Sequence, residues 1–313
     1  MGQLSLRTVT RDQGAVQALK DGSVQPGGFT LEFTEVQPLI RAFRRMVREL
    51  AYDVTEMAFT TYLAARAQGK PFTALPVFCV RDFHHGAIRT AAASDLAPGD
   101  LEGKRVGVNR GYTVTTGVWA RGILADFYGV DPAKVTWMLS GDEHVAEYVP
   151  PPNVVPVGDG QDVPALVASG ELAAGIGIPA GPETRPLIPD AEEAGYRALR
   201  ERGYYPINHV VVVRDELLAR HPDLAPALFE AYAESKRRYV AALAAGAITD
   251  PGPNERRYTR VAEITGADPM PYGIEPNRSM IDQLISYAAD QKILDRPFTA
   301  EEIFADGTHD LKG

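Results

Sequence analysis

Leu101-Glu-Gly-Lys-Arg-Val-Gly-Val108 combines a turn with a short apolar segment that predicts a β-strand. Residues 113–128 then have the length and apolar spacing of a helix, and residues 135–139 predict a second strand. A strand, a helical crossover and another strand in this order are typical of a parallel sheet covered by helices. This part of the chain therefore predicts an α/β fold.

The same alternation extends in both directions along the chain. Strands are predicted at residues 4–9, 29–33, 53–57, 73–80, 173–178 and 209–213. Helices are predicted around residues 15–19 and at 39–50, 60–67, 163–169 and 224–243, with further helix toward the C-terminus. Residues 149–156 are predicted to be a surface connection, and residues 179–204 a loop with a short helix.

The chain is predicted to form two lobes. It passes from the first lobe to the second near residues 81–88 and returns near residues 204–210. Lobe I would then contain residues 1–85 and 208–313, and lobe II residues 86–207. Two connecting segments of this kind imply a hinge and a cleft between the lobes.

Composition and charge exclude several classes of protein. The chain has 313 residues, of which 45% are hydrophobic and 23% are charged, as in globular proteins of one or two domains. Its net charge is −9 and it has no block of five basic residues, so nucleic acid is not an expected partner. Because Cys79 is the single cysteine, one chain cannot build a disulfide framework or a cysteine-ligated metal centre.

The N-terminal residues predict the compartment. Gln3, Arg7, Arg11 and Asp12 interrupt the stretch where a secretory signal would need an unbroken apolar run. No run of 18 apolar residues occurs elsewhere, so no membrane partner is expected. We therefore expect a cytoplasmic protein. The sequence leaves open whether the chain forms a homo-oligomer.

Several groups of residues resemble a known family. Residues 95–108 and 128–137 are similar to the second lobe of type 2 periplasmic solute-binding proteins. More specific groups are Glu56-Met57 with Tyr62, Pro76-Val77-Phe78 with Arg81, Phe83 and His85, Trp119 with Arg121 to Leu124, His209 to Val212, and Pro276-Asn277-Arg278. With these groups the chain resembles the 4,5-dihydroxyphthalate decarboxylase family over nearly its whole length.

This resemblance implies both a fold and an activity. The fold would be the two-lobed, type 2 periplasmic-binding-protein-like α/β fold, in which each lobe is a mostly parallel sheet flanked by helices. The activity would be that of a carboxy-lyase in aromatic compound catabolism, without a cofactor. The family has a second arginine where this chain has His84, and the segment between Val108 and Trp119 is one residue longer here. We therefore expect this chain to bind a second substrate carboxylate more weakly than other members of the family do.

Decarboxylation of a hydroxylated aromatic acid requires particular groups. Protonation of the ring carbon that bears the carboxylate, followed by CO2 loss, needs a positioned acid, an acceptor for the phenolic hydroxyl and donors for any carboxylate that stays. A histidine gives and takes protons near neutrality. His85 is the predicted proton donor, with His209 or Glu56 at the phenolic hydroxyl.

Substrate carboxylates are predicted to bind at two helix starts and two arginines. Thr60 and Thr61 stand at one helix start, and Tyr112, Thr113, Thr115 and Thr116 at another. Free backbone N–H groups favour anions there, although capping is the alternative role for these threonines. The further substrate-binding candidates are Arg81, Arg11, His84 and Asp12. Asp12 would accept a phenolic hydroxyl, or instead cap the first helix.

No metal is expected, and two other functions stay open. The sequence contains neither His-x-His nor His-Glu-x-x-His, and adjacent His84 and His85 would face opposite sides of a strand. The first alternative is a non-catalytic binding protein for an aromatic or organic acid, which a leader peptide would favour. The second is a dehydratase of the menaquinone-pathway chorismate dehydratase type, whose fold is similar.

Overall fold

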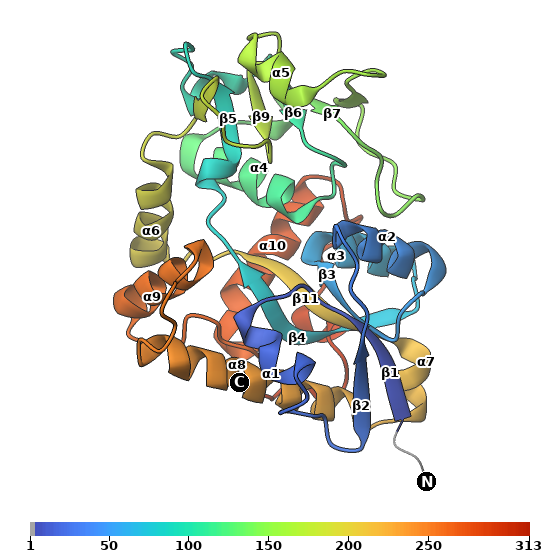
Figure 1. The fold of residues 1–313 in the computed structure, drawn as a ribbon. Coiled ribbons are helices and arrows are strands. Elements are labelled where there is room, and N and C mark those ends of the chain that lie inside the picture. The colour runs from blue at the N-terminus through green and yellow to red at the C-terminus, as the bar shows by residue number, and fades with distance from the viewer. Residues whose placement is uncertain (1–3) are drawn as a thin grey trace. The chain divides into compact units, whose positions relative to one another are not determined.

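A five-stranded mixed sheet forms the centre of the first unit of the chain, with the strand order β2-β1-β3-β11-β4. The computed structural model describes residues 4–313 (Figure 1). The strands are β1 (Leu4–Val9), β2 (Phe29–Phe33), β3 (Val54–Ala58), β4 (Phe72–Arg81) and β11 (Ile207–Arg214). The first three strands are parallel, whereas β11 runs antiparallel to both β3 and β4.

The helices of this unit bury apolar stripes against the sheet. In α2 (Ile40–Glu49), for example, Ala42, Phe43, Met46 and Val47 are buried at helical spacing, and Leu50 ends the helix in the left-handed region with φ 50°. The other elements are η1 (Gly14–Val16), α1 (Gln17–Lys20), α3 (Phe59–Ala67), α7 (Asp215–Arg220), α8 (Leu224–Ala244), α9 (Pro253–Thr265), η5 (Glu275–Asn277) and α11 (Ala300–Ile303).

The strand order creates a switch point between β1 and β3. The chain leaves β1 for β2 on one side and then returns to β3 on the other side of β1. In parallel α/β sheets, connections that diverge in this way leave a crevice at the carboxyl ends of the two strands, where ligands commonly bind. Arg11 and the first turn of α3 follow directly after these two strand ends.

The second unit has a six-stranded sheet with the order β10-β5-β9-β6-β7-β8. Its strands are β5 (Ile88–Ala91), β6 (Arg105–Val108), β7 (Thr136–Leu139), β8 (Val154–Pro156), β9 (Ala174–Ile176) and β10 (Thr184–Pro186). Its helical segments are η2 (His85–Ala87), η3 (Pro98–Leu101), α4 (Thr115–Tyr128), η4 (Pro132–Lys134), α5 (Val163–Ala168) and α6 (Ala191–Arg202). Gly107 lets α5 approach β6, because a Cβ there would lie 2.4 Å from Val163 Cγ1.

The α/β class is confirmed, with three local differences. Each sheet is mostly parallel, as predicted, but contains one antiparallel strand, which is β11 between β3 and β4 in the first unit and β5 between β10 and β9 in the second. The segment predicted as a loop with a short helix contains β10 and the 12-residue helix α6. The Pro-rich connection ends in β8, whose three residues pair with β7. Short edge strands such as β8 and β10 carry too little apolar periodicity to be recognised in sequence.

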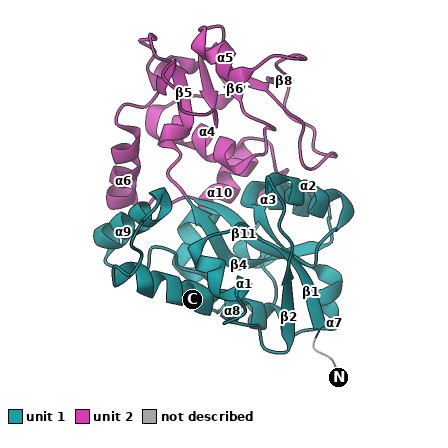
Figure 2. Ribbon diagram, in the orientation of Figure 1, with its two compact units in different colours: residues 1–81, 207–282, 298–313 teal, residues 82–206, 283–297 magenta. Residues whose placement is uncertain are grey.

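Figure 2 shows the two units in different colours. One comprises Met1–Arg81, Ile207–Asp282 and Phe298–Gly313, and the other Asp82–Pro206 and Gln283–Pro297. The chain thus changes unit within α10 (Arg278–Asp290), whereas the sequence prediction kept residues 208–313 in one lobe. Residues 1–3 of that lobe lie outside the described range. No helix of the described chain is long and apolar enough to cross a membrane.

Candidate active site

Glu56 is a carboxylate in the middle of β3, a strand whose five residues are all buried. Its side chain has no exposed surface. An ionised carboxylate without partners would cost several kcal/mol at such a position, so groups of opposite charge or strong donors must surround it.

Arg11 and His209 supply those partners from the two strands that flank β3. Arg11, which follows β1, donates its backbone N–H to Glu56 Oε2 at 2.9 Å and its Nε–H to Oε1 at 2.7 Å. His209, on β11, pairs with Ala58 in the strand register, and its Nδ1 lies 2.6 Å from Glu56 Oε1. Adjacent strands therefore bring together three of the residues selected from the sequence.

The geometry defines the orientation of the His209 ring. Nδ1 lies 2.6 Å from the Glu56 carboxylate and 2.9 Å from Arg11 Nη2. A ring nitrogen either donates a proton or accepts one, and a guanidinium only donates. We assign Nδ1–H as the donor to Glu56, because that contact is shorter and involves a carboxylate. Nε2 is then the ring nitrogen that does not contact Glu56.

The surroundings of Glu56 keep it ionised. Burial raises the pKa of this carboxyl, but the hydrogen bond from His209 and the positive charge of Arg11 outweigh burial and lower the pKa to about 2. Glu56 is thus an anion at neutral pH and a poor acceptor of a proton. It can orient the imidazole and balance its charge, as the carboxylate does in other acid–base pairs.

His209 and Arg11 are the accessible members of this cluster. Their side chains are 13% and 34% exposed, whereas Glu56 is 0% exposed. The ring of Phe43, on α2, packs edge-on against the His209 ring with centroids 5.2 Å apart. An approaching ligand would therefore meet the imidazole and the guanidinium, and would not touch the carboxylate behind them.

Thr60 and Thr61 occupy the first turn of α3, directly after β3, and both are fully buried. Neither caps the helix, because the N-cap position is Ala58 and carries no side-chain cap. The capping role that the sequence suggested for Asp12 is wrong as well. The N-cap of η1 is Gln13, and the exposed Asp12 carboxylate lies 3.8 Å from Lys20 Nζ.

Arg81 ends β4 and is buried. Its guanidinium donates to Asn277 Oδ1 and lies over the ring of Phe78, with Cζ 5.8 Å from the centroid. Asn277 in turn donates to the carbonyls of Pro271 and Gly273 at 2.9 and 2.8 Å. These contacts connect two of the sequence groups that carried the family resemblance.

His84 and His85 belong to the second unit. They do not lie on a strand, although the sequence prediction placed them on one. His84 is the N-cap of η2 and His85 its first residue. The His85 ring contacts Phe127 and Tyr204, and its Nδ1 has no hydrogen-bond partner in the described chain. Burial, with a smaller effect of His84, lowers the pKa of His85 to about 4. The convergence of His85 and His209 on one ligand stays a prediction.

The turn before α4 has an internal carboxylate partner. Thr113 donates its backbone N–H and its hydroxyl to Glu143 Oε2 at 3.2 and 2.6 Å, and the backbone N–H of Tyr112 donates to Oε1. Thr115 begins the helix and is buried, and Thr116 is partly exposed. Threonine capping does not occur here either, since the N-cap is Val114 without a side-chain cap.

Sequence reasoning missed Glu143 and the role of Arg121. Glu143 lies in an irregular segment without hydrophobic periodicity, so no sequence pattern indicates its partner. Arg121 is a fully buried cation between apolar neighbours on α4, and a charge at a buried helix position was a signal that could have been followed. Among residues 4–313, no group of three or more His, Cys, Asp or Glu side chains is arranged to hold a metal ion.

The two α/β units have the fold of the periplasmic binding proteins. The aliphatic sulphonate binding protein of Escherichia coli matches with a TM-score of 0.56 and 10% identity, over 98% of this chain and 99% of that protein. Such low identity shows the fold alone. No protein-family model matches the chain.

Sequence relatives define the family. A 4,5-dihydroxyphthalate decarboxylase of Comamonas testosteroni is 28% identical over 323 residues, which cover 97% of each protein. One of Pseudomonas putida is 31% identical over 186 residues, which cover 56% of this chain and 71% of that protein. The chain belongs to the 4,5-dihydroxyphthalate decarboxylase family, a family of carboxy-lyases. The resemblance inferred from the sequence is thereby confirmed.

Proposed function

We propose that this enzyme decarboxylates a hydroxylated aromatic acid of the 4,5-dihydroxyphthalate kind without a cofactor, and that His209 donates the proton. The observation that carries the proposal is the buried Glu56 carboxylate, which holds Arg11 and His209 at the carboxyl ends of β1 and β3. The names of the two sequence relatives support the substrate class.

In the proposed reaction, the proton on His209 Nε2 moves to the ring carbon that bears the leaving carboxylate. A hydroxyl para to this carbon donates electron density and stabilises the protonated ring. The bond between the ring and the carboxylate then breaks, its electron pair returns to the ring, and CO2 leaves. His209 is left neutral and regains its proton from water, so the net reaction consumes one proton and releases one CO2.

Glu56 and Arg11 support this step in different ways. Because the pKa of Glu56 is about 2, this residue acts as a positioning group that holds Nδ1–H and offsets the charge of the imidazolium. The guanidinium of Arg11 has five N–H donors, of which Nε–H contacts Glu56 and one on Nη2 faces His209 Nδ1. The other donors would orient a substrate carboxylate next to His209.

The proposal assigns proton donation to His209 instead of His85. With its pKa lowered to about 4, His85 carries a proton in only about one molecule in a thousand at pH 7. Its ring also packs against Phe127 and Tyr204. His85 is therefore better suited to an aromatic wall than to acid catalysis at neutral pH.

The test is turnover of 4,5-dihydroxyphthalate and a panel of hydroxybenzoates, followed by CO2 release and product mass. We expect His209→Gln to lower kcat about 100-fold or more, and His85→Gln to retain most of it. Wild-type turnover by His209→Gln would falsify the assignment. Tight binding without a product would instead favour a binding protein, and loss of water would favour a dehydratase.

A further inference from the structure

A carboxylate of the chain itself occupies the N-terminus of α4. Glu143 accepts the backbone N–H groups of Tyr112 and Thr113 and the hydroxyl of Thr113. A helix of 14 residues begins two residues later, at Thr115. Backbone donors and the helix dipole both favour a negative charge at this place.

Gly111 leaves the room that this carboxylate uses. A Cβ at residue 111 would lie 2.6 Å from Glu143 Oε2 and 2.9 Å from Oε1. Any other residue would therefore displace the carboxylate from the backbone donors. The turn is shaped to hold a carboxylate group tightly against the main chain.

Arg121 gives the same turn a buried positive charge. The side chain reaches back along α4, so that Nη2 donates to the carbonyl of Tyr112 at 2.7 Å and Nε to Gln291 Oε1 at 2.7 Å. Nη1 lies 3.0 Å from where a Cβ of Gly117 would be, in the first turn of the helix.

The donors around this turn exceed what the chain satisfies. Among the residues described, Arg121 Nη1 and the hydroxyl of Tyr148 are buried without hydrogen-bond partners. Both named acceptors of Arg121 are neutral oxygens. A fully buried guanidinium of this kind is stabilised when an anion lies close to it.

We propose that this turn, with Arg121 beneath it, is a carboxylate-binding site, which Glu143 occupies until the carboxylate of an aromatic ligand replaces it. The proposal rests on the proposed function for the choice of an aromatic dicarboxylate as the ligand. Glu143 is then a built-in competitor, whose charge sets how strongly a ligand must bind to enter. Removal of that charge should strengthen binding.

The probe is phthalate, which has two carboxylates on one ring and lacks the hydroxyls that assist decarboxylation. Calorimetry on the full chain compares the wild type with Glu143→Gln. We expect about tenfold tighter binding of phthalate by the variant, because the amide competes less well for the N–H donors. The matched control is Glu147→Gln, which removes the same charge from an exposed position of the same segment and should leave the affinity unchanged.

Equal or weaker binding of phthalate by Glu143→Gln would show that Glu143 only closes the helix end, and would overturn the proposal. Glu143→Asp is the second variant, since it keeps the charge with a shorter reach. It should bind with intermediate affinity, and thermal unfolding verifies that each variant is folded.

The outcomes also separate this proposal from the proposed function, because phthalate binding requires no turnover. A gain in phthalate affinity without any decarboxylase activity would contradict the proposed function but support the carboxylate site. Decarboxylase activity without a gain in phthalate affinity would contradict only the role proposed for Glu143.

Discussion

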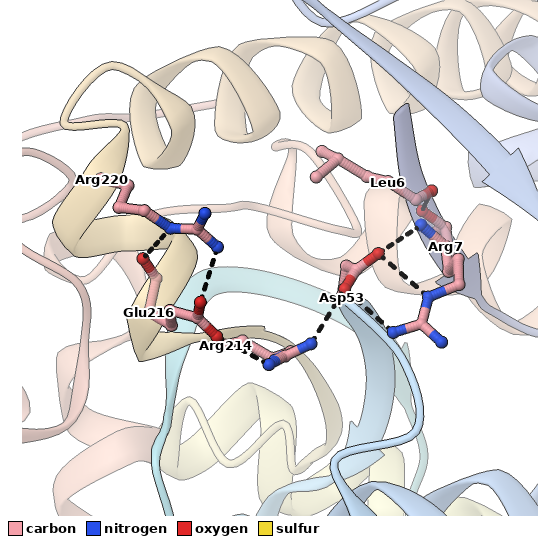
Figure 3. Close-up of polar contacts among 7 residues, drawn as sticks. Leu6, Arg7, Asp53, Arg214, Glu216 and Arg220 are labelled. Atoms are coloured by element: carbon pink, nitrogen blue, oxygen red, sulfur yellow. Dashed lines mark hydrogen bonds and ion pairs between the residues drawn. The ribbon is translucent and has the colours of Figure 1, made fainter. Parts of the chain in front are cut away.

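Two carboxylates at the same strand, Asp53 and Glu56, have arginine partners but different surroundings. Asp53, just before β3, accepts from the backbone N–H of Arg7 at 2.8 Å and from the guanidinium groups of Arg7 and Arg214 at 3.3 to 3.4 Å (Figure 3). Arg214 also contacts Glu216, which pairs with Arg220. The side chains of Arg7 and Arg220 are 54% and 58% exposed, whereas Glu56 is 0% exposed.

The two carboxylates differ in their burial and in the imidazole that contacts Glu56 alone. The Asp53 contacts join β1 to the ends of β3 and β11, and the Arg7 side chain among them is 54% exposed. Ion pairs with an exposed partner contribute about 0 to 1 kcal/mol. The Glu56 carboxylate is fully buried, so loss of one of its partners costs about 3 to 5 kcal/mol. His209 adds an imidazole, the group to which we assign proton donation.

The largest expected effect is that of Glu56→Gln. The amide cannot balance an imidazolium and would direct an N–H group toward Arg11 or His209. We expect kcat to fall about 100-fold or more and the free energy of unfolding to fall by about 3 kcal/mol. Steady-state kinetics and urea unfolding measure the two losses, and near wild-type kcat in a folded variant would contradict the positioning role.

The second effect is a pH dependence of stability that belongs to Glu56. Its pKa is lowered from 4.5 to about 2, so the unfolded chain binds the proton more readily than the folded one. The stabilisation is present above about pH 4.5 and is lost as the pH falls toward 2, by about 3 kcal/mol in total. Urea unfolding at several pH values should show the wild type and Glu56→Gln converging in this range. A constant difference would contradict the assignment.

The smallest effect is expected for Asp53→Asn, the matched change at the carboxylate with a largely exposed arginine partner, Arg7. The amide keeps an acceptor oxygen, and the ion pairs that it weakens are screened by water. We expect the free energy of unfolding to change by about 1 kcal/mol or less, and kcat to stay at the wild-type value. A loss of kcat as large as that of Glu56→Gln would remove the distinction between the two sites.

The sequence was sufficient for much of the first unit. Regular alternation located β1, β2, β3, β4 and β11, because each has a run of apolar residues bounded by turns. Once these strands share a sheet, Arg11, Glu56 and His209 lie on neighbouring strands. What the sequence could not supply was the pairing itself, which depends on β11 inserting antiparallel beside β3.

In the second unit, the local sequence pattern did not predict the contacts of the candidate site residues. Glu143 binds a turn about 30 residues earlier in the chain, and such long-range contacts leave no periodic signal. The environment of His85 was missed for a related reason. The rings that its imidazole contacts, those of Phe127 and Tyr204, come from distant parts of the sequence.

The passage of α10 from one unit to the other has a consequence for biosynthesis. Gln291, directly after α10, accepts from Arg121 and donates to the carbonyl of Val118 at 2.9 Å. The ribosome makes residues 82–206 long before it makes Gln291, so a nascent chain holds the Arg121 guanidinium without this partner. The second unit can therefore finish folding only when nearly the whole polypeptide has emerged, and a message truncated before codon 283 would yield an incomplete second unit.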